Sequence, residues 1–137
     1  MQVQSGDPGK AQLAQILQNS WKKIGITVKL QTLESTTIYS NRKSGDFEIA
    51  MFEMTNDISD PDEWMHYMFA STAAVNSGYS SKKVDQLIDE AASNDDAATR
   101  KKLYKAVQPI LAADVPEFPP AATPGLFVGR TGGENFK

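Results

Sequence analysis

The residues with the most obvious chemical potential lie in one short stretch, "TNDISDPDEWMHYMF", which spans residues 55–69. It holds His66, the only histidine of the chain, and four acidic residues: Asp57, Asp60, Asp62 and Glu63. Carboxylates and an imidazole at this spacing could perform acid–base catalysis, bind a metal ion, or pair with a cationic ligand group. They could also form a solvated loop that leads into a helix.

The pattern argues against a metal site. A calcium loop of the EF-hand kind needs Gly at its sixth position and Glu at its twelfth, and counted from Asp57 these positions hold Asp62 and Met68. A transition-metal site would have one histidine, no cysteine, and carboxylates drawn from elsewhere in the chain. We therefore expect no metal ion and no other cofactor.

A catalytic interpretation lacks a marked nucleophile. Asp57 and Asp60 could act as a carboxylate pair, but nothing in the stretch identifies a partner for them. We expect no catalytic residues, and His66 is interpreted as a surface or packing histidine of a short helix. A small hydrolase that uses Asp57, Asp60 and His66, with or without a divalent metal, stays open as an alternative, as does a plain interaction module.

Asp57 differs from its neighbours in its position. Asp60 or Asp62 is expected to cap the helix that begins near Glu63. Asp57 instead comes shortly after the apolar run at residues 49–52, which predicts a buried strand. Ligands of open α/β sheets bind outside the carboxyl ends of the strands. We therefore predict that Asp57 pairs with a cationic ligand group such as an amine.

Several further elements follow from apolar spacing and from start and stop signals. Helices are predicted at residues 9–25, 34–45, 63–69, 81–93 and 97–114. The first should bury a stripe made of Leu13, Ile16, Leu17, Trp21 and Ile24. Strands are predicted at residues 1–4, 26–33, 46–54 and 126–130, the second with Ile26, Val28 and Leu30 inward. Pro109 should kink the last helix.

Strands that alternate with helices indicate an α/β protein with a parallel or mixed central sheet flanked by helices. The chain has 137 residues, so we expect one domain over residues 1–137. Acidic residues outnumber basic ones by 17 to 14, which argues against nucleic acid as a partner. The absence of cysteine fits an exported protein. No apolar run approaches the roughly 18 residues of a membrane helix.

Taken in order, these segments resemble the oligopeptide- and dipeptide-type solute-binding proteins of ABC importers, family 5. Residues 11–52, from "AQLAQILQNSWKKIG" to "GDFEIAMF", are similar to the opening of that family's second lobe. "DPDEW" matches its "D-P-D-N-F"-like turn. Residues 76–119, from "NSGYSSKKVDQLIDEA" to "VPEFP", match the family's "G-Y-S-N-x-x-V-D-x-L-I" segment and the helix that follows it.

The resemblance implies a three-layer lobe of the periplasmic-binding-protein type and a receptor without catalysis. In peptide-binding members, an Asp three residues before the "D-P-D" turn pairs with the α-amino group of the ligand, and here that residue is Asp57. Met54 stands where the family usually has Trp, so this part of the pocket wall differs. Asn56 and Trp64 complete the set of expected ligand-binding residues. Other members bind nickel chelates, sugars or opines.

The resemblance also implies that the chain is one part of a two-lobe protein that closes on its ligand like a hinge. Residues 1–137 would form part of the second lobe, and residues 115–137 would return toward the missing N-terminal lobe. The expected partners are a peptide or another small solute, the membrane subunits of the importer, and that other lobe. The isolated lobe could dimerise. The expected location is outside the cytoplasm, periplasmic or lipid-anchored, and a targeting segment would then lie outside this sequence.

Overall fold

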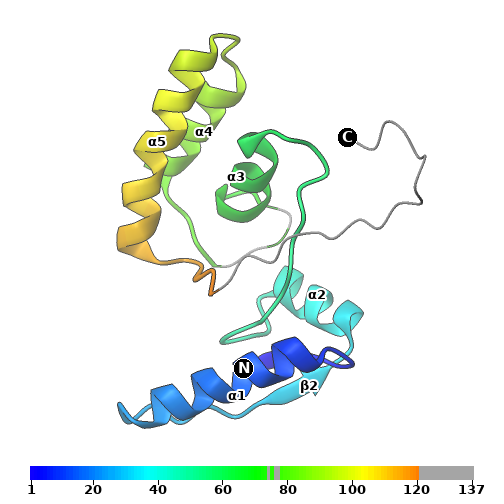
Figure 1. The fold of residues 1–137 in the computed structure, drawn as a ribbon. Coiled ribbons are helices and arrows are strands. Elements are labelled where there is room, and N and C mark those ends of the chain that lie inside the picture. The colour runs from blue at the N-terminus through cyan, green and yellow to red at the C-terminus, as the bar shows by residue number, and fades with distance from the viewer. Residues whose placement is uncertain (74, 76–77, 121–137) are drawn as a thin grey trace, which may run out of the picture.

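The computed structural model describes residues 1–73, 75 and 78–120 (Figure 1). The predicted strand at residues 126–130 lies outside them. The elements are β1 (Gln2–Gln4), α1 (Pro8–Lys22), β2 (Gln31–Leu33), α2 (Ser35–Ser44), α3 (Pro61–Phe69), α4 (Lys82–Ala92) and α5 (Ala97–Asp114). Figure 1 shows two groups: α1, α2 and the strands lie together, and α3, α4 and α5 pack beside one another above them. Residues 45–60 connect the two groups.

The helices begin where local capping signals predict. In four of them, the side chain of the N-cap residue accepts a hydrogen bond from a backbone N–H of the first turn. These N-cap residues are Asp7, Asp60, Ser81 and Asp96. Such a cap satisfies a donor that the helix leaves without an internal partner. Gly45 ends α2 with a φ of 77°, a left-handed conformation that glycine adopts without a Cβ penalty. The last helix runs through Pro109 as far as Asp114.

The strands form a small parallel sheet. β1 pairs with β2 in the register Gln2 to Gln31 through Gln4 to Leu33. On the other edge of β1, an isolated parallel bridge joins Gln2 to Ala50. The Gln2 N–H donates to the Ile49 carbonyl at 2.8 Å, and the Met51 N–H donates to the Gln2 carbonyl at 2.9 Å. β1 therefore lies between two parallel neighbours, as expected for an α/β protein.

Two of the predicted strands are shorter and less buried than expected. Of residues 26–33, only Gln31–Leu33 pair, because β1 begins opposite Gln31 and offers residues 26–30 no partner. Ile26 is consequently 50% exposed. The segment 46–54 contributes one bridge rather than a strand covered on both faces, and Ile49 is 38% exposed. Strand predictions fail here because a strand needs a paired neighbour as well as an apolar sequence.

The main apolar core lies among α3, α4 and α5. Its buried members are Met68, Phe69, Ala70, Val84, Leu87, Ile88 and Val107. Val84, Ile88 and Val107 have no exposed surface, so one apolar face of α4 and one of α5 lie in this core. None of the described helices is long and apolar enough to cross a lipid bilayer.

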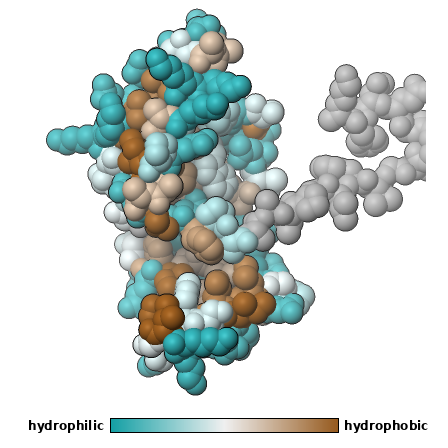
Figure 2. Space-filling model, turned by 60° about the vertical axis from the view of Figure 1, so that its left-hand side comes forward, coloured by the Kyte–Doolittle hydropathy of each residue, from teal (hydrophilic) through white to brown (hydrophobic). Residues whose placement is uncertain are grey.

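The predicted apolar stripe of α1 is largely uncovered within the described part of the chain. Ile16 is 53% exposed and Ile24 is 71% exposed, and Ala14 is the one residue of α1 that is buried. The prediction of a buried stripe is therefore wrong for these two isoleucines. Figure 2 shows hydrophobic residues at the surface of the lower group, which contains α1 and β2. Apolar surface of this kind marks a region that another surface can cover.

Candidate ligand-binding site

The backbone at Asp57 is held by the first turn of α3. The Glu63 carboxylate accepts the N–H of Asp57 at 2.9 Å and the N–H of Ile58 at 3.1 Å. Glu63 is the third residue of the helix, so its side chain reaches back over the helix start, as an acidic residue at this position does in a capping box. The Asp57 side chain itself is exposed.

We expect Glu63→Ala to free the backbone at Asp57 and Ile58. Both N–H groups lose a charged acceptor, and their amide hydrogen exchange should become roughly three- to tenfold faster. Glu63→Gln retains one acceptor oxygen and should give a smaller increase. Hydrogen exchange followed by NMR measures both effects. Glu90→Ala, an exposed change on α4, is the control, and equal acceleration in Glu90→Ala would contradict the role of Glu63.

Asp60 caps α3, as predicted, and also connects that helix to α5. Its carboxylate accepts the Asp62 N–H at 2.9 Å and lies 2.7 Å from the Arg100 guanidinium through both of its oxygens. Asp62 accepts a hydrogen bond from the Tyr104 hydroxyl at 3.1 Å. Burial, followed by this hydrogen bond to Asp62, raises the pKa of Tyr104 to about 12. The Asp60–Pro61–Asp62 turn is thus scaffolding that fixes the start of α3.

His66 links α3 to α4. Its Nε2 lies 3.1 Å from Asp89 Oδ1, and its Nδ1 lies 2.8 Å from Asp62 Oδ1 at an angle outside hydrogen-bond geometry. Burial disfavours the charged imidazole, but the hydrogen bond to Asp89 and the charge of Asp62 outweigh burial and raise the pKa of His66. These contacts suit the packing histidine that the sequence indicates.

The three residues of the alternative hydrolase interpretation face different partners. Asp60 pairs with Arg100, and His66 contacts Asp62 and Asp89, while Asp57 is held through its backbone by Glu63. Among the described residues, no group of three or more His, Cys, Asp or Glu side chains is placed to hold a metal ion. The geometry of the described residues therefore offers this alternative no assembled centre.

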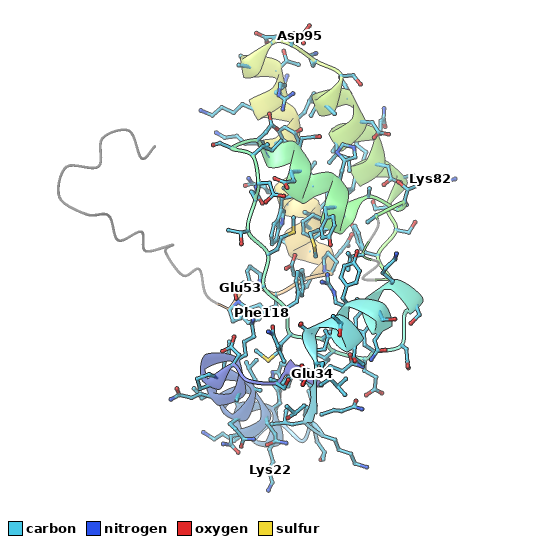
Figure 3. The ribbon with its side chains drawn as sticks, turned by 90° about the vertical axis from the view of Figure 1, so that its right-hand side faces the viewer. Lys22, Glu34, Glu53, Lys82, Asp95 and Phe118 are labelled. Atoms are coloured by element: carbon cyan, nitrogen blue, oxygen red, sulfur yellow. The ribbon has the colours of Figure 1, made fainter. Side chains whose placement is uncertain are left out.

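A hollow of about 570 Å³ lies where the two groups of elements meet. It is lined by Gln4, Lys10, Ser35, Ile38, Tyr39, Arg42, Met51, Phe52, Glu53, Met54, Thr55, Asp57, Glu63 and Tyr67. Figure 3 shows Glu53 at the level between α1 below and α3 above. This volume lies within the range of small-molecule sites in proteins.

The expected ligand-binding residues are only partly brought together. Asp57 and Met54 both line the hollow. Asn56 lies beside it, in an adjoining depression of about 520 Å³ that also includes Asp57. Trp64 lines neither of them and is half-buried against the apolar core of α3, α4 and α5. The side chain of Trp64 therefore contributes to packing in this structure.

Several residues of the hollow carry no sequence signal that connects them with Asp57. Lys10 comes from the first turn of α1, where its Nζ lies 3.1 Å from Asp7 and 3.2 Å from Glu53. Tyr39 and Arg42 come from α2, and Tyr67 comes from α3. Their side chains approach Asp57 only through tertiary packing. Spacing along the chain therefore could not have identified them.

Comparison with known proteins identifies the family. Residues 1–76 match the family described as "Bacterial extracellular solute-binding proteins, family 5 Middle". The chain belongs to this family of binding proteins, and it has the α/β fold of periplasmic binding proteins.

Particular relatives narrow the comparison. The chain is 31% identical over 116 residues to di/tripeptide-binding protein 1 of Pseudomonas aeruginosa, a match that covers 82% of this chain and 22% of that protein. It is 30% identical over 114 residues to the dipeptide-binding protein of Escherichia coli, with 80% and 21% covered. A dipeptide-binding protein from Pseudoalteromonas, solved in complex with Met-Leu, shares the fold with a TM-score of 0.78 at 21% identity, with 84% and 24% covered. The chain thus spans about a fifth of the length of the curated relatives that it matches.

Proposed function

We propose that this chain is a ligand-binding lobe of the substrate-binding protein of an ABC importer, and that its ligands are peptides. The observation that carries the proposal is an exposed carboxylate, Asp57, at a hollow of about 570 Å³ in a chain of this family. The free amine of a peptide would form a charge-assisted hydrogen bond with it. The names of the two curated relatives support peptides as the ligand class.

Recognition by hinged closure is part of the proposal. The chain would form part of the second of two lobes, with residues 115–137 leading to the N-terminal lobe and the ligand enclosed between the lobes. The complete protein would work outside the cytoplasm, in the periplasm or on a lipid anchor, and deliver peptides to the importer's membrane subunits. The exposed Ile16 and Ile24 offer surface that a further part of the protein, or a second copy of the isolated chain, would cover.

Thermal unfolding of the complete polypeptide tests this function. A short peptide with a free amine should raise the melting temperature, because a ligand that binds only the folded state adds about 2.7 kcal/mol at roughly 100 times its Kd. Divalent metal ions should leave the melting temperature unchanged. Stabilisation by metal ions but by no member of a short-peptide library would contradict the proposal and favour the hydrolase alternative.

Native mass spectrometry of the protein from its source provides an independent check. The proposal expects a polypeptide far heavier than 15.0 kDa, carrying small adducts that leave on denaturation. A native chain of 137 residues without an adduct would contradict the two-lobe receptor.

A further inference from the structure

His66 lies between two carboxylates that belong to different helices. Its Nε2 lies 3.1 Å from Oδ1 of Asp89, on α4. Its Nδ1 lies 2.8 Å from Oδ1 of Asp62, which precedes it by four residues on α3. The Nδ1 atom is buried, and among the described residues it forms no hydrogen bond of good geometry. Both ring nitrogens therefore face a carboxylate oxygen.

The protonation state of the ring decides whether this arrangement is favourable. A neutral imidazole has one N–H and one lone pair, so it can donate to Asp62 or to Asp89 but not to both. The lone pair of its other nitrogen would then face a second acceptor. The imidazolium has an N–H on each nitrogen and a charge opposite to that of both carboxylates. Only the protonated form of His66 is attracted to α3 and to α4 at the same time.

The groups in contact with this arrangement support the protonated form. Burial lowers the pKa of His66, but the hydrogen bond to Asp89 and the charge of Asp62 outweigh burial and raise it. From α5, the Tyr104 hydroxyl donates to the same Oδ1 of Asp62 at 3.1 Å. Tyr104 has a pKa of about 12, so its hydroxyl stays neutral where histidine titrates.

The neighbouring charged groups on α4 and α5 are engaged with other partners. Arg100 on α5 lies 2.7 Å from the Asp60 carboxylate. Asp85, one turn before Asp89 on α4, accepts hydrogen bonds from the backbone N–H and the hydroxyl of Ser71. The contacts of His66 with Asp62 and Asp89 are therefore the part of this surface that a change of pH near neutrality should alter.

We propose that protonated His66 links α3 to α4 through both carboxylates, so that the packed group of α3, α4 and α5 is more stable in mildly acidic than in mildly alkaline solution. The raised pKa of His66 fixes the direction of this effect. The stabilisation is complete below the ordinary histidine pKa of 6.5, and it is lost as the pH rises through the raised pKa. The inference concerns the fold and is independent of the proposed function.

NMR titration of the 137-residue chain tests the two contacts directly. His66 is the only histidine, so the Hε1 signal of its ring is assigned without ambiguity. Its pKa should lie above 6.5. Asp89→Asn and Asp62→Asn should each lower this pKa, because each removes one charge and keeps the size of the side chain. Asp95→Asn removes a charge from an exposed position between α4 and α5 and should leave the pKa unchanged.

Two results of this titration would overturn the proposal. One is a pKa of His66 at or below 6.5 in the unmodified chain. The other is an unchanged pKa in Asp89→Asn or in Asp62→Asn, because the link needs both carboxylates. Asp89 is 72% exposed, so Asp89→Asn should fold and keep the test decisive.

Urea unfolding at about pH 5.5 and about pH 8 measures the effect on stability. His66→Gln keeps a polar side chain that does not titrate, so its pH dependence reports all the other groups. Relative to His66→Gln, the unfolding equilibrium constant of the unmodified chain should be roughly two- to fivefold lower at the acidic pH than at the alkaline one. The effect is modest because His66 is 34% and Asp89 72% exposed. The same pH dependence in both proteins, or a difference of opposite sign, would overturn the proposal.

Discussion

Asp57→Asn in the complete polypeptide should weaken the binding of free-amine peptides roughly 10- to 100-fold and spare their N-acetylated forms. Asn keeps the size of the side chain and one acceptor oxygen, so the change removes mainly the charge. A charged acceptor is worth most against an ammonium group that closure removes from water. Isothermal titration of both peptide forms against both proteins measures the difference.

The matched control is Asp95→Asn, which removes an equal charge from an exposed position between α4 and α5. It should leave both affinities unchanged. An equal loss for free-amine and N-acetylated peptides in Asp57→Asn would contradict the anchor role and indicate a general disturbance of the loop. The backbone N–H groups of Asp57 and Ile58 donate to the Glu63 carboxylate, and these hydrogen bonds do not involve the Asp57 side chain, so the loop itself should survive the substitution.

The helices could be predicted because their signals are local. Asp7 followed by Pro8, Asp60 followed by Pro61, and Ser81 ahead of an apolar period each specify a helix start through hydrogen bonds within one turn. The predicted first residues of the helices agree with those in the structure to within a few residues. Apolar residues of α4 and α5 are buried because the two helices can cover one another.

The strands and part of the site could not be predicted in this way. The alternation from Ile26 to Leu30 indicates a strand, but pairing requires a neighbour that β1 provides only from Gln31 onward. Asp57, which follows an apolar run, lines a hollow in the structure, and its pairing with an amine stays a prediction. Arg42 reaches the same hollow because α2 packs against residues that follow it, and no local pattern encodes that approach. Site residues brought together by tertiary contacts therefore need the fold before they can be recognised.

Ile88→Ala should destabilise the 137-residue chain by about 2–5 kcal/mol. Ile88 has no exposed surface and lies in the core of α3, α4 and α5, so the truncation leaves a cavity that the neighbouring side chains fill only in part. Urea unfolding followed by circular dichroism measures the change as a lower midpoint with a similar slope. A cost within about 0.5 kcal/mol, typical of surface positions, would contradict this core assignment.

Ile16→Ala is the informative counterpart, because it deletes the same atoms from a residue that is 53% exposed. In the 137-residue chain it should change the free energy of unfolding by less than about 0.5 kcal/mol, since the side chain is largely in water and Ala favours a helix. In the complete polypeptide, where we propose that further chain covers α1, the same substitution should cost more. Neutrality in both proteins would show that this face of α1 stays in water. A large, concentration-dependent cost in the 137-residue chain would show that a second copy covers it.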